Sequence, residues 1–100
     1  ALSSAASDVY KRQMQYSFDE ILKDLNIGRE IEFEYQNRQY AIVNGNGKWL
    51  FCEGTKCEDL CCFEEKDTLI EKIKNLKAGG SSLKEIFDNH LYAPGSLYIL

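Results

Sequence analysis

The sequence predicts an α+β domain, in which an antiparallel sheet of three to four strands packs against three helices. Three observations carry this prediction. Residues 30–35 alternate between charged and large apolar side chains, pairs rich in Asn and Gly interrupt the apolar segments that follow, and apolar residues recur at helical spacing near both ends of the chain. The expected order of elements is α-β-β-β-(β)-α-α-(β), where parentheses mark short strands.

The first helix is expected over residues 18–26. Ser17 and Glu20 form a capping box, in which a hydroxyl and a carboxylate satisfy backbone N–H groups that have no partner inside the helix. Gly28 follows at the position where helices often end in a left-handed residue. The apolar stripe that would face the core consists of Phe18, Ile21, Leu22 and Leu25.

A three-stranded antiparallel meander is expected after this helix. The first strand covers residues 31–35, and a tight turn at residues 37–38 leads into a second strand over residues 39–43. The sequence Asn-Gly-Asn-Gly at residues 44–47 predicts another turn, because Asn and Gly tolerate the positive φ of hairpin turns. The third strand then covers residues 48–53.

These turns would pair Tyr35 with Tyr40 and Ile42 with Trp49, which places the large apolar residues of the three strands on one face. That face is interpreted as the core side of the sheet. The opposite face would be acidic at one edge and apolar in its centre, with Glu32, Glu34, Ala41, Val43, Leu50 and Cys52. Such a centre needs a cover, which a helix of the same chain or a partner protein can supply.

The second half of the chain is expected to be mainly helical. Residues 60–64 would form a short fourth strand, and Asp67 would cap a helix that runs to Lys77 and ends at Gly79. A second capping box begins the last helix at Ser82. The terminal letters LYIL read as a strand or as a tail docked on the core.

The bulk composition bounds the number of domains and the partners. One hundred residues, 44% of them hydrophobic, suffice for one small domain with a single core. The formal charge of −4 comes without a basic run, which disfavours direct binding to nucleic acid and favours a protein partner with a basic surface. The sequence shows no membrane span and no secretory signal, so no membrane association is expected and the predicted location is the cytoplasm.

Residues 1–13 are interpreted separately from the domain, which is expected to cover residues 14–100. The stretch SSAASDVYKRQ, residues 3–13, resembles the in-frame translation of a transposase-tagging adaptor from DNA sequencing libraries. We therefore expect residues 1–13 to be a non-native or disordered leader that packs on nothing, with Met14 as the natural start. The leader holds two basic residues and one acidic residue, so the charge without it is −4 − 1 = −5.

Four cysteines lie close together, at Cys52, Cys57, Cys61 and Cys62. Thiolates this near to one another could bind zinc, but the spacing lacks the paired C-x2-C of zinc ribbons and fingers. The alternative interpretation makes Cys52 and one of the adjacent pair small buried hydrophobic residues, with the thiols reduced. We therefore predict no metal and no cofactor, and these four residues are the candidate ligands if a metal is bound.

No catalytic residue is predicted, and the protein is expected not to be an enzyme. His90 is the only histidine, and nothing in the sequence marks a nucleophile, an orienting group or an oxyanion site to accompany it. Its position near the end of a predicted helix favours a capping role instead.

The candidate partner-binding residues lie on the second sheet face. They are Glu30, Glu32, Glu34, Ala41, Val43 and Leu50. An acidic strip beside an apolar patch suits docking on a basic protein surface, because the charges orient the partner and the apolar groups are removed from water.

The phrases GREIEFEYQNRQYAIV, GKWLFCEG and SLKEIFDN resemble those of small uncharacterised proteins of bacteria and their phages. The element order in a short acidic chain is also similar to that of small anti-CRISPR proteins, which occupy the nucleic-acid- or PAM-reading surface of a CRISPR nuclease. Toxin-neutralising immunity proteins share this profile. The resemblance implies a non-enzymatic inhibitor or antitoxin-like binder of a bacterial or mobile-element genome. The alternatives are a homodimeric structural protein that pairs through the second sheet face, and a small zinc or thiol protein that uses the cysteines.

Overall fold

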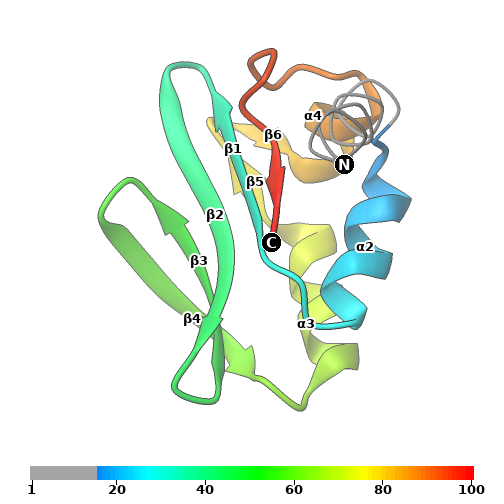
Figure 1. Cartoon of the computed structure of the whole chain (residues 1–100), viewed down its shortest axis with the longest axis vertical. Helices are drawn as coiled ribbons and strands as arrows, with labels where there is room; N and C mark the ends of the chain where they lie inside the picture. Colours follow the sequence, from blue (N-terminus) through cyan, green and yellow to red (C-terminus); the bar gives the residue numbers. More distant parts are fainter. Residues whose placement is uncertain (1–15) are drawn as a thin grey trace, which may run out of the picture.

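The computed structural model describes residues 16–100, so the predicted leader lies outside the described residues. The elements are α2 (Phe18–Asn26), β1 (Ile31–Tyr35), β2 (Arg38–Gly45), β3 (Lys48–Glu53), β4 (Lys56–Cys62), α3 (Lys66–Asn75), β5 (Lys77–Ala78), β6 (Ser81–Ser82), α4 (Leu83–Asp88) and β7 (Tyr98–Ile99). The strands form a five-stranded antiparallel sheet in the order β4-β3-β2-β1-β7 and a separate β5–β6 hairpin. The predicted α+β class and element order are confirmed, and Figure 1 shows the three helices on one side of the sheet.

Helix α2 has the predicted bounds, and of its predicted capping box the hydroxyl half is formed. The Ser17 hydroxyl accepts a hydrogen bond from the Glu20 N–H at 3.4 Å, which satisfies one of the free donors of the first turn. Gly28 has a φ of +90°, the left-handed conformation that ends the helix. No helix among residues 16–100 is long and apolar enough to cross a membrane.

The predicted register of both hairpins is wrong by two residues, although the predicted faces are right. Gln36 and Asn37 form the first turn, with φ values of +53° and +62°, so Phe33 lies opposite Tyr40 and not opposite Ile42. The rings of Phe33 and Tyr40 stack with their centroids 5.5 Å apart, and this contact stabilises the observed pairing. Because side chains alternate with a period of two, a shift of two residues keeps every side chain on its face.

The second hairpin is tighter than expected. Asn46 and Gly47 form a two-residue turn with φ values of +54° and +78°, whereas a four-residue turn was predicted. Asn44 and Gly45 continue the strand, so Ile42 pairs with Phe51. Positive φ at both central positions is the geometry that follows the twist of a hairpin, and Asn-Gly is its commonest sequence.

The second half of the chain departs from the prediction in three places. Strand β4 is longer than the expected residues 60–64. Helix α3 begins at Lys66 rather than after Asp67, because the Leu69 N–H already bonds to the Glu65 carbonyl at 2.9 Å. It ends at Asn75, and the segment expected to complete it forms the β5–β6 hairpin around Gly79.

The C-terminal strand and the loop before it close the second edge of the sheet. Ile99 pairs with Ile31, and the Leu100 N–H bonds to the Glu30 carbonyl at 2.8 Å. The strand expected at the end of the chain is thereby confirmed, and its partner is β1, which is the first strand in sequence.

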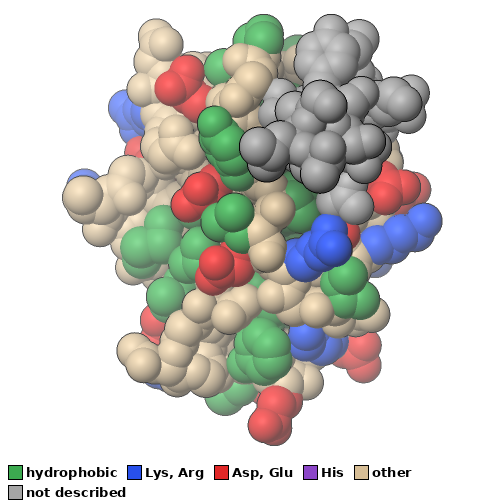
Figure 2. All heavy atoms as spheres, in the orientation of Figure 1, with side chains coloured by type: hydrophobic (Ala, Val, Ile, Leu, Met, Phe, Trp, Pro, Cys, Tyr) green, Lys and Arg blue, Asp and Glu red, His purple; other side chains and the backbone are tan. Residues whose placement is uncertain are grey.

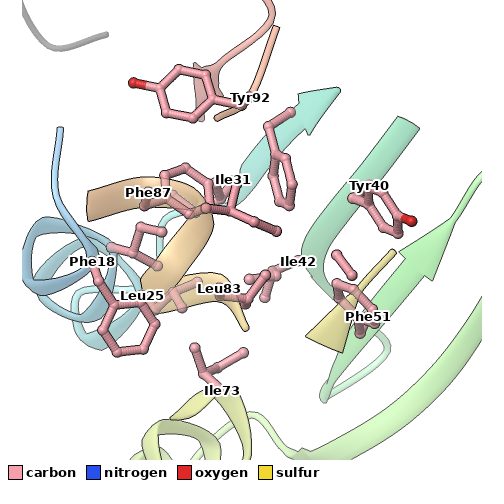
Figure 3. Close-up of a cluster of buried hydrophobic side chains, with 14 of the residues drawn as sticks. Phe18, Leu25, Ile31, Tyr40, Ile42, Phe51, Ile73, Leu83, Phe87 and Tyr92 are labelled. Atoms are coloured by element: carbon pink, nitrogen blue, oxygen red, sulfur yellow. The ribbon is translucent and has the colours of Figure 1, made fainter. Parts of the chain in front are cut away.

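The core lies between the inner sheet face and the three helices (Figure 3). Ile31 and Ile42 from the sheet meet Leu25, Leu83 and Phe87 from the helices, as Figure 3 shows, and all five side chains are fully buried. Burying such a side chain contributes about 1.5–3 kcal/mol. The inner face is therefore the side of the sheet whose burial stabilises the domain.

Asp88 ties helix α4 to the start of α2. Its Oδ1 accepts the Phe18 N–H at 2.9 Å, and its Oδ2 accepts a hydrogen bond from Lys84 Nζ at 2.8 Å. These two contacts, the lysine first, hold the pKa of Asp88 below its usual value, because both stabilise the charged carboxylate.

Candidate partner-binding face

The outer face of the sheet is the side that none of the described helices covers (Figure 1). One row of directly paired residues crosses this face from edge to edge: Tyr98, Glu32, Ala41, Cys52 and Cys57. A second row places Val43 beside Leu50 and Asp59. In the view of Figure 2, acidic and hydrophobic side chains are interspersed over the sheet.

The apolar centre of the outer face is formed as predicted. Ala41, Val43 and Leu50 lie on adjacent strands and are half-buried, in contrast to Ile42 and Trp49, which point inward and are fully buried. The three outer side chains therefore shield one another but keep contact with water. A partner that covered them would remove this remaining apolar surface from water. The favourable free energy would be about 25 cal/mol for each Å² of apolar surface buried.

Tyr98 belongs to this face and was not predicted. Its side chain is 52% exposed, and it lies directly opposite Glu32 across the β1–β7 pair. The sequence predicted the terminal strand but not its neighbour, so it gave no reason to place Tyr98 beside the acidic residues. Exposed tyrosines are frequent at protein interfaces, because the ring buries a large area and the hydroxyl can still donate a hydrogen bond.

The three predicted glutamates do not play one role. Among residues 16–100, the carboxylates of Glu32 and Glu34 form neither an ion pair nor a hydrogen bond. Glu30 lies before β1, and its Oε2 accepts the Asn44 N–H at 2.8 Å. Glu30 thus links the start of β1 to the neighbouring strand β2 through this hydrogen bond. The acidic strip therefore consists of Glu32 and Glu34 alone.

The basic residues nearest in sequence to this strip are paired elsewhere. Arg38 Nη1 lies 2.6 Å from Glu53 Oε2, and Lys48 Nζ lies 3.2 Å from Asp59 Oδ2. Both pairs are exposed, so each contributes about 0–1 kcal/mol to stability. They leave the negative charge of the strip uncompensated.

The expectation that the cysteines are reduced is wrong for two of them. Cys52 and Cys57 form a disulfide, with Cα atoms 4.0 Å apart across the β3–β4 hairpin. The two residues flank a two-residue turn symmetrically, and this places their side chains opposite each other on the outer face. That C-x4-C spacing around a Gly-Thr turn is the signal that could have predicted the bond.

The four cysteines do not converge on one point. Cys61 packs against the core and its Sγ donates to the Glu65 carbonyl at 3.7 Å, while Cys62 is exposed. Within residues 16–100 no three His, Cys, Asp or Glu side chains are placed to hold one metal ion.

The two free thiols are held in the protonated form. Burial, followed by the charge of Glu65, raises the pKa of Cys61. A side-chain hydrogen bond with Glu65 and its charge raise the pKa of Cys62. A thiol is a poor nucleophile and a poor metal ligand until it loses its proton, so both surroundings oppose thiolate chemistry at neutral pH.

The chain matches no family model, and comparisons with curated proteins and with solved structures find no match either.

Proposed function

We propose that this protein is a non-enzymatic binding module that docks a basic protein on its outer sheet face. The observation that carries the proposal is a combination on the sheet face that the described helices leave uncovered: a half-buried apolar centre lies beside two carboxylates, Glu32 and Glu34, that have no ion pair among the described residues. A sheet with one covered and one open face supplies such a surface without disturbing its core.

The apolar centre and the two glutamates of the outer face would contribute differently to binding. The apolar residues Ala41, Val43 and Leu50 would supply affinity, because their remaining exposed surface leaves water on docking. Glu32 and Glu34 would attract Lys or Arg side chains and fix the orientation of the partner. Because neither carboxylate is paired within the described chain, no internal ion pair has to break first.

An inhibitor or immunity-type role follows from the same chemistry. A nucleic-acid-reading surface of a nuclease, or a toxin that acts on nucleic acid, is basic because it binds phosphates. An acidic face on a small domain competes for that surface. This would make the protein anti-CRISPR-like or antitoxin-like, of bacterial or mobile-element origin, as the resemblance implies.

The test uses charge reversal with a matched control. The products of the genes that flank this reading frame would be prepared singly and titrated against the protein by calorimetry. E32K/E34K is expected to weaken binding of the basic partner at least tenfold, whereas E71K/E85K, with the same change in net charge on exposed positions of α3 and α4, is expected to bind within threefold of the parent. Equal losses in both variants would mean that net charge matters and the outer face does not.

A second candidate is a homodimer through the same face. The half-buried apolar centre and the 52% exposed Tyr98 favour it, since two copies would cover each other's apolar groups. Light scattering at micromolar concentration separates the candidates: a mass of two chains that returns to one chain in V43D/L50D identifies the dimer.

A further inference from the structure

The two sulfurs of the Cys52–Cys57 disulfide are in unlike surroundings. Cys52 lies in β3, between two neighbouring strands, and is 8% exposed. Cys57 lies in β4, the edge strand of the sheet, and is exposed. Of the two residues, Cys57 is therefore the one that a reagent in solution can reach more readily.

The direction of the bond reinforces this difference. In thiol–disulfide exchange, a thiolate attacks one sulfur and the other leaves, with the three sulfurs close to a line. The direction from Cys52 through Cys57 leads beyond β4, where the described sheet has no further strand. The opposite direction leads to Ala41 on β2, which is paired with Cys52. Attack on Cys57 with Cys52 as the leaving group is the open route.

A hollow of about 360 Å³ lies along the edge of β4 and is lined by Phe51, Glu53, Lys56, Cys57, Glu58 and Lys77. Phe51 stacks on Tyr40 in the core and pairs with Glu58, so these side chains belong to the inner face, whereas Cys52 and Cys57 point to the outer face. The lysines of the hollow therefore give the disulfide no preference for an anionic reagent, and its reactivity depends on access to Cys57 alone.

We propose that Cys57 is the site at which small thiols, with glutathione as the probe, reversibly open the Cys52–Cys57 disulfide. The thiolate of the reagent forms a new S–S bond with Cys57 Sγ, the Cys52–Cys57 bond breaks, and its electron pair leaves on Cys52 Sγ, which takes a proton from water. A second reagent thiolate then attacks the sulfur of the first, releasing Cys57 as a thiol and one oxidised reagent disulfide. The protein bond is thereby reduced by two electrons, and two reagent thiols are oxidised.

The exchange leaves the sheet in place. Strand β4 remains held by its ladder with β3 and by the buried side chain of Leu60 on the inner face. The adduct would stand on the row that runs through Ala41 to Glu32, so where the outer face is the docking face, as proposed above, it adds a bulky anionic group there. Modification of Cys57 itself does not depend on that proposal.

The experiment uses the full chain with C61S/C62S, which leaves the disulfide as the sole source of thiols. After a brief incubation with reduced glutathione in native buffer, free thiols are alkylated and the protein is cut with trypsin. Cleavage after Lys48, Lys56 and Lys66 places Cys52 in peptide 49–56 and Cys57 in peptide 57–66. We expect glutathione on peptide 57–66 and the alkyl group on peptide 49–56, in at least tenfold excess over the reverse pattern.

Two outcomes overturn the proposal. Equal labelling of the two peptides would show that attack is not directed by the sheet edge. Exchange that needs urea would show that it requires unfolding.

Failure of partner binding in E32K/E34K bears on the docking proposal alone, because glutathione exchange needs no partner.

Discussion

Two adjacent residues of β2 test whether the outer sheet face is open in solution. Ile42 points inward and is fully buried, while Val43 points outward and is half-buried. Ile42→Ala leaves a cavity in the core and is expected to lower the free energy of unfolding by about 3–4 kcal/mol. Val43→Ala removes two methyl groups that already touch water, so the expected loss is about 1 kcal/mol. Both changes lower strand propensity alike, so the difference of about 2–3 kcal/mol reports burial.

Urea unfolding followed by the fluorescence of Trp49 measures both losses. Trp49 is the only tryptophan and is fully buried, so its emission follows the loss of the core. A small domain has about 5–15 kcal/mol of stability, and Ile42→Ala should shift the midpoint strongly without changing the slope. If Val43→Ala lost as much stability as Ile42→Ala, the outer face would be covered and the docking proposal would fail. If the loss of unfolding free energy in Val43→Ala instead grew with protein concentration, the outer face would be the interface of the dimer.

Three further predictions concern single contacts. C52A/C57A should lower the free energy of unfolding by about 2 kcal/mol, the loop-entropy value for a ring of about six residues, and leave the circular dichroism spectrum unchanged; loss of the folded spectrum would contradict it. Because the folded pKa of Asp88 lies below its unfolded value of about 3.9, its stabilisation is present above that pH and disappears as pH falls through the folded pKa. The urea midpoint of Asp88→Asn should therefore lie below the parent's at pH 7 and approach it as the pH falls below about 3.9, whereas a constant difference would assign the loss to another cause. Gly80→Ala should lower the free energy of unfolding by about 1–2 kcal/mol, because alanine is strained at its left-handed φ. Gly79→Ala should lower it further, since its new Cβ would also lie 2.6 Å from the side-chain oxygen of Gln36. Equal urea midpoints for the two variants would show that the Gln36 side chain moves away freely.

Local patterns were sufficient for the elements that local interactions stabilise. The capping hydroxyls of Ser17 and Ser82 bond to the N–H three residues on, as their spacing predicts. The faces of β1, β2 and β3 were also predictable, because alternation decides them whatever the register. The predicted binding residues Ala41 and Val43 therefore lie on the outer face although the expected pairing was two residues off.

Contacts between distant segments decided what the sequence left open. The register of the first hairpin depends on Phe33 stacking on Tyr40, and the end of α3 depends on a hairpin that packs beside Gln36. The position of Tyr98 depends on which strand the chain end reaches. A short stretch of sequence does not reveal these contacts. Another apolar residue on the same strand face, a few positions away, could form the same kind of contact.

The sequence by itself determined the α+β class, the order of its elements and the amphipathic character of the sheet, because periodicity and capping are properties of neighbouring residues. Only the tertiary structure decided that all three described helices lie on one side, that the Glu30 carboxylate bonds to Asn44 while those of Glu32 and Glu34 have no partner among residues 16–100, and that Cys52 meets Cys57. These contacts depend on which segments, distant in the sequence, pack together and exclude water. That packing is a property of the whole folded chain and not of neighbouring residues.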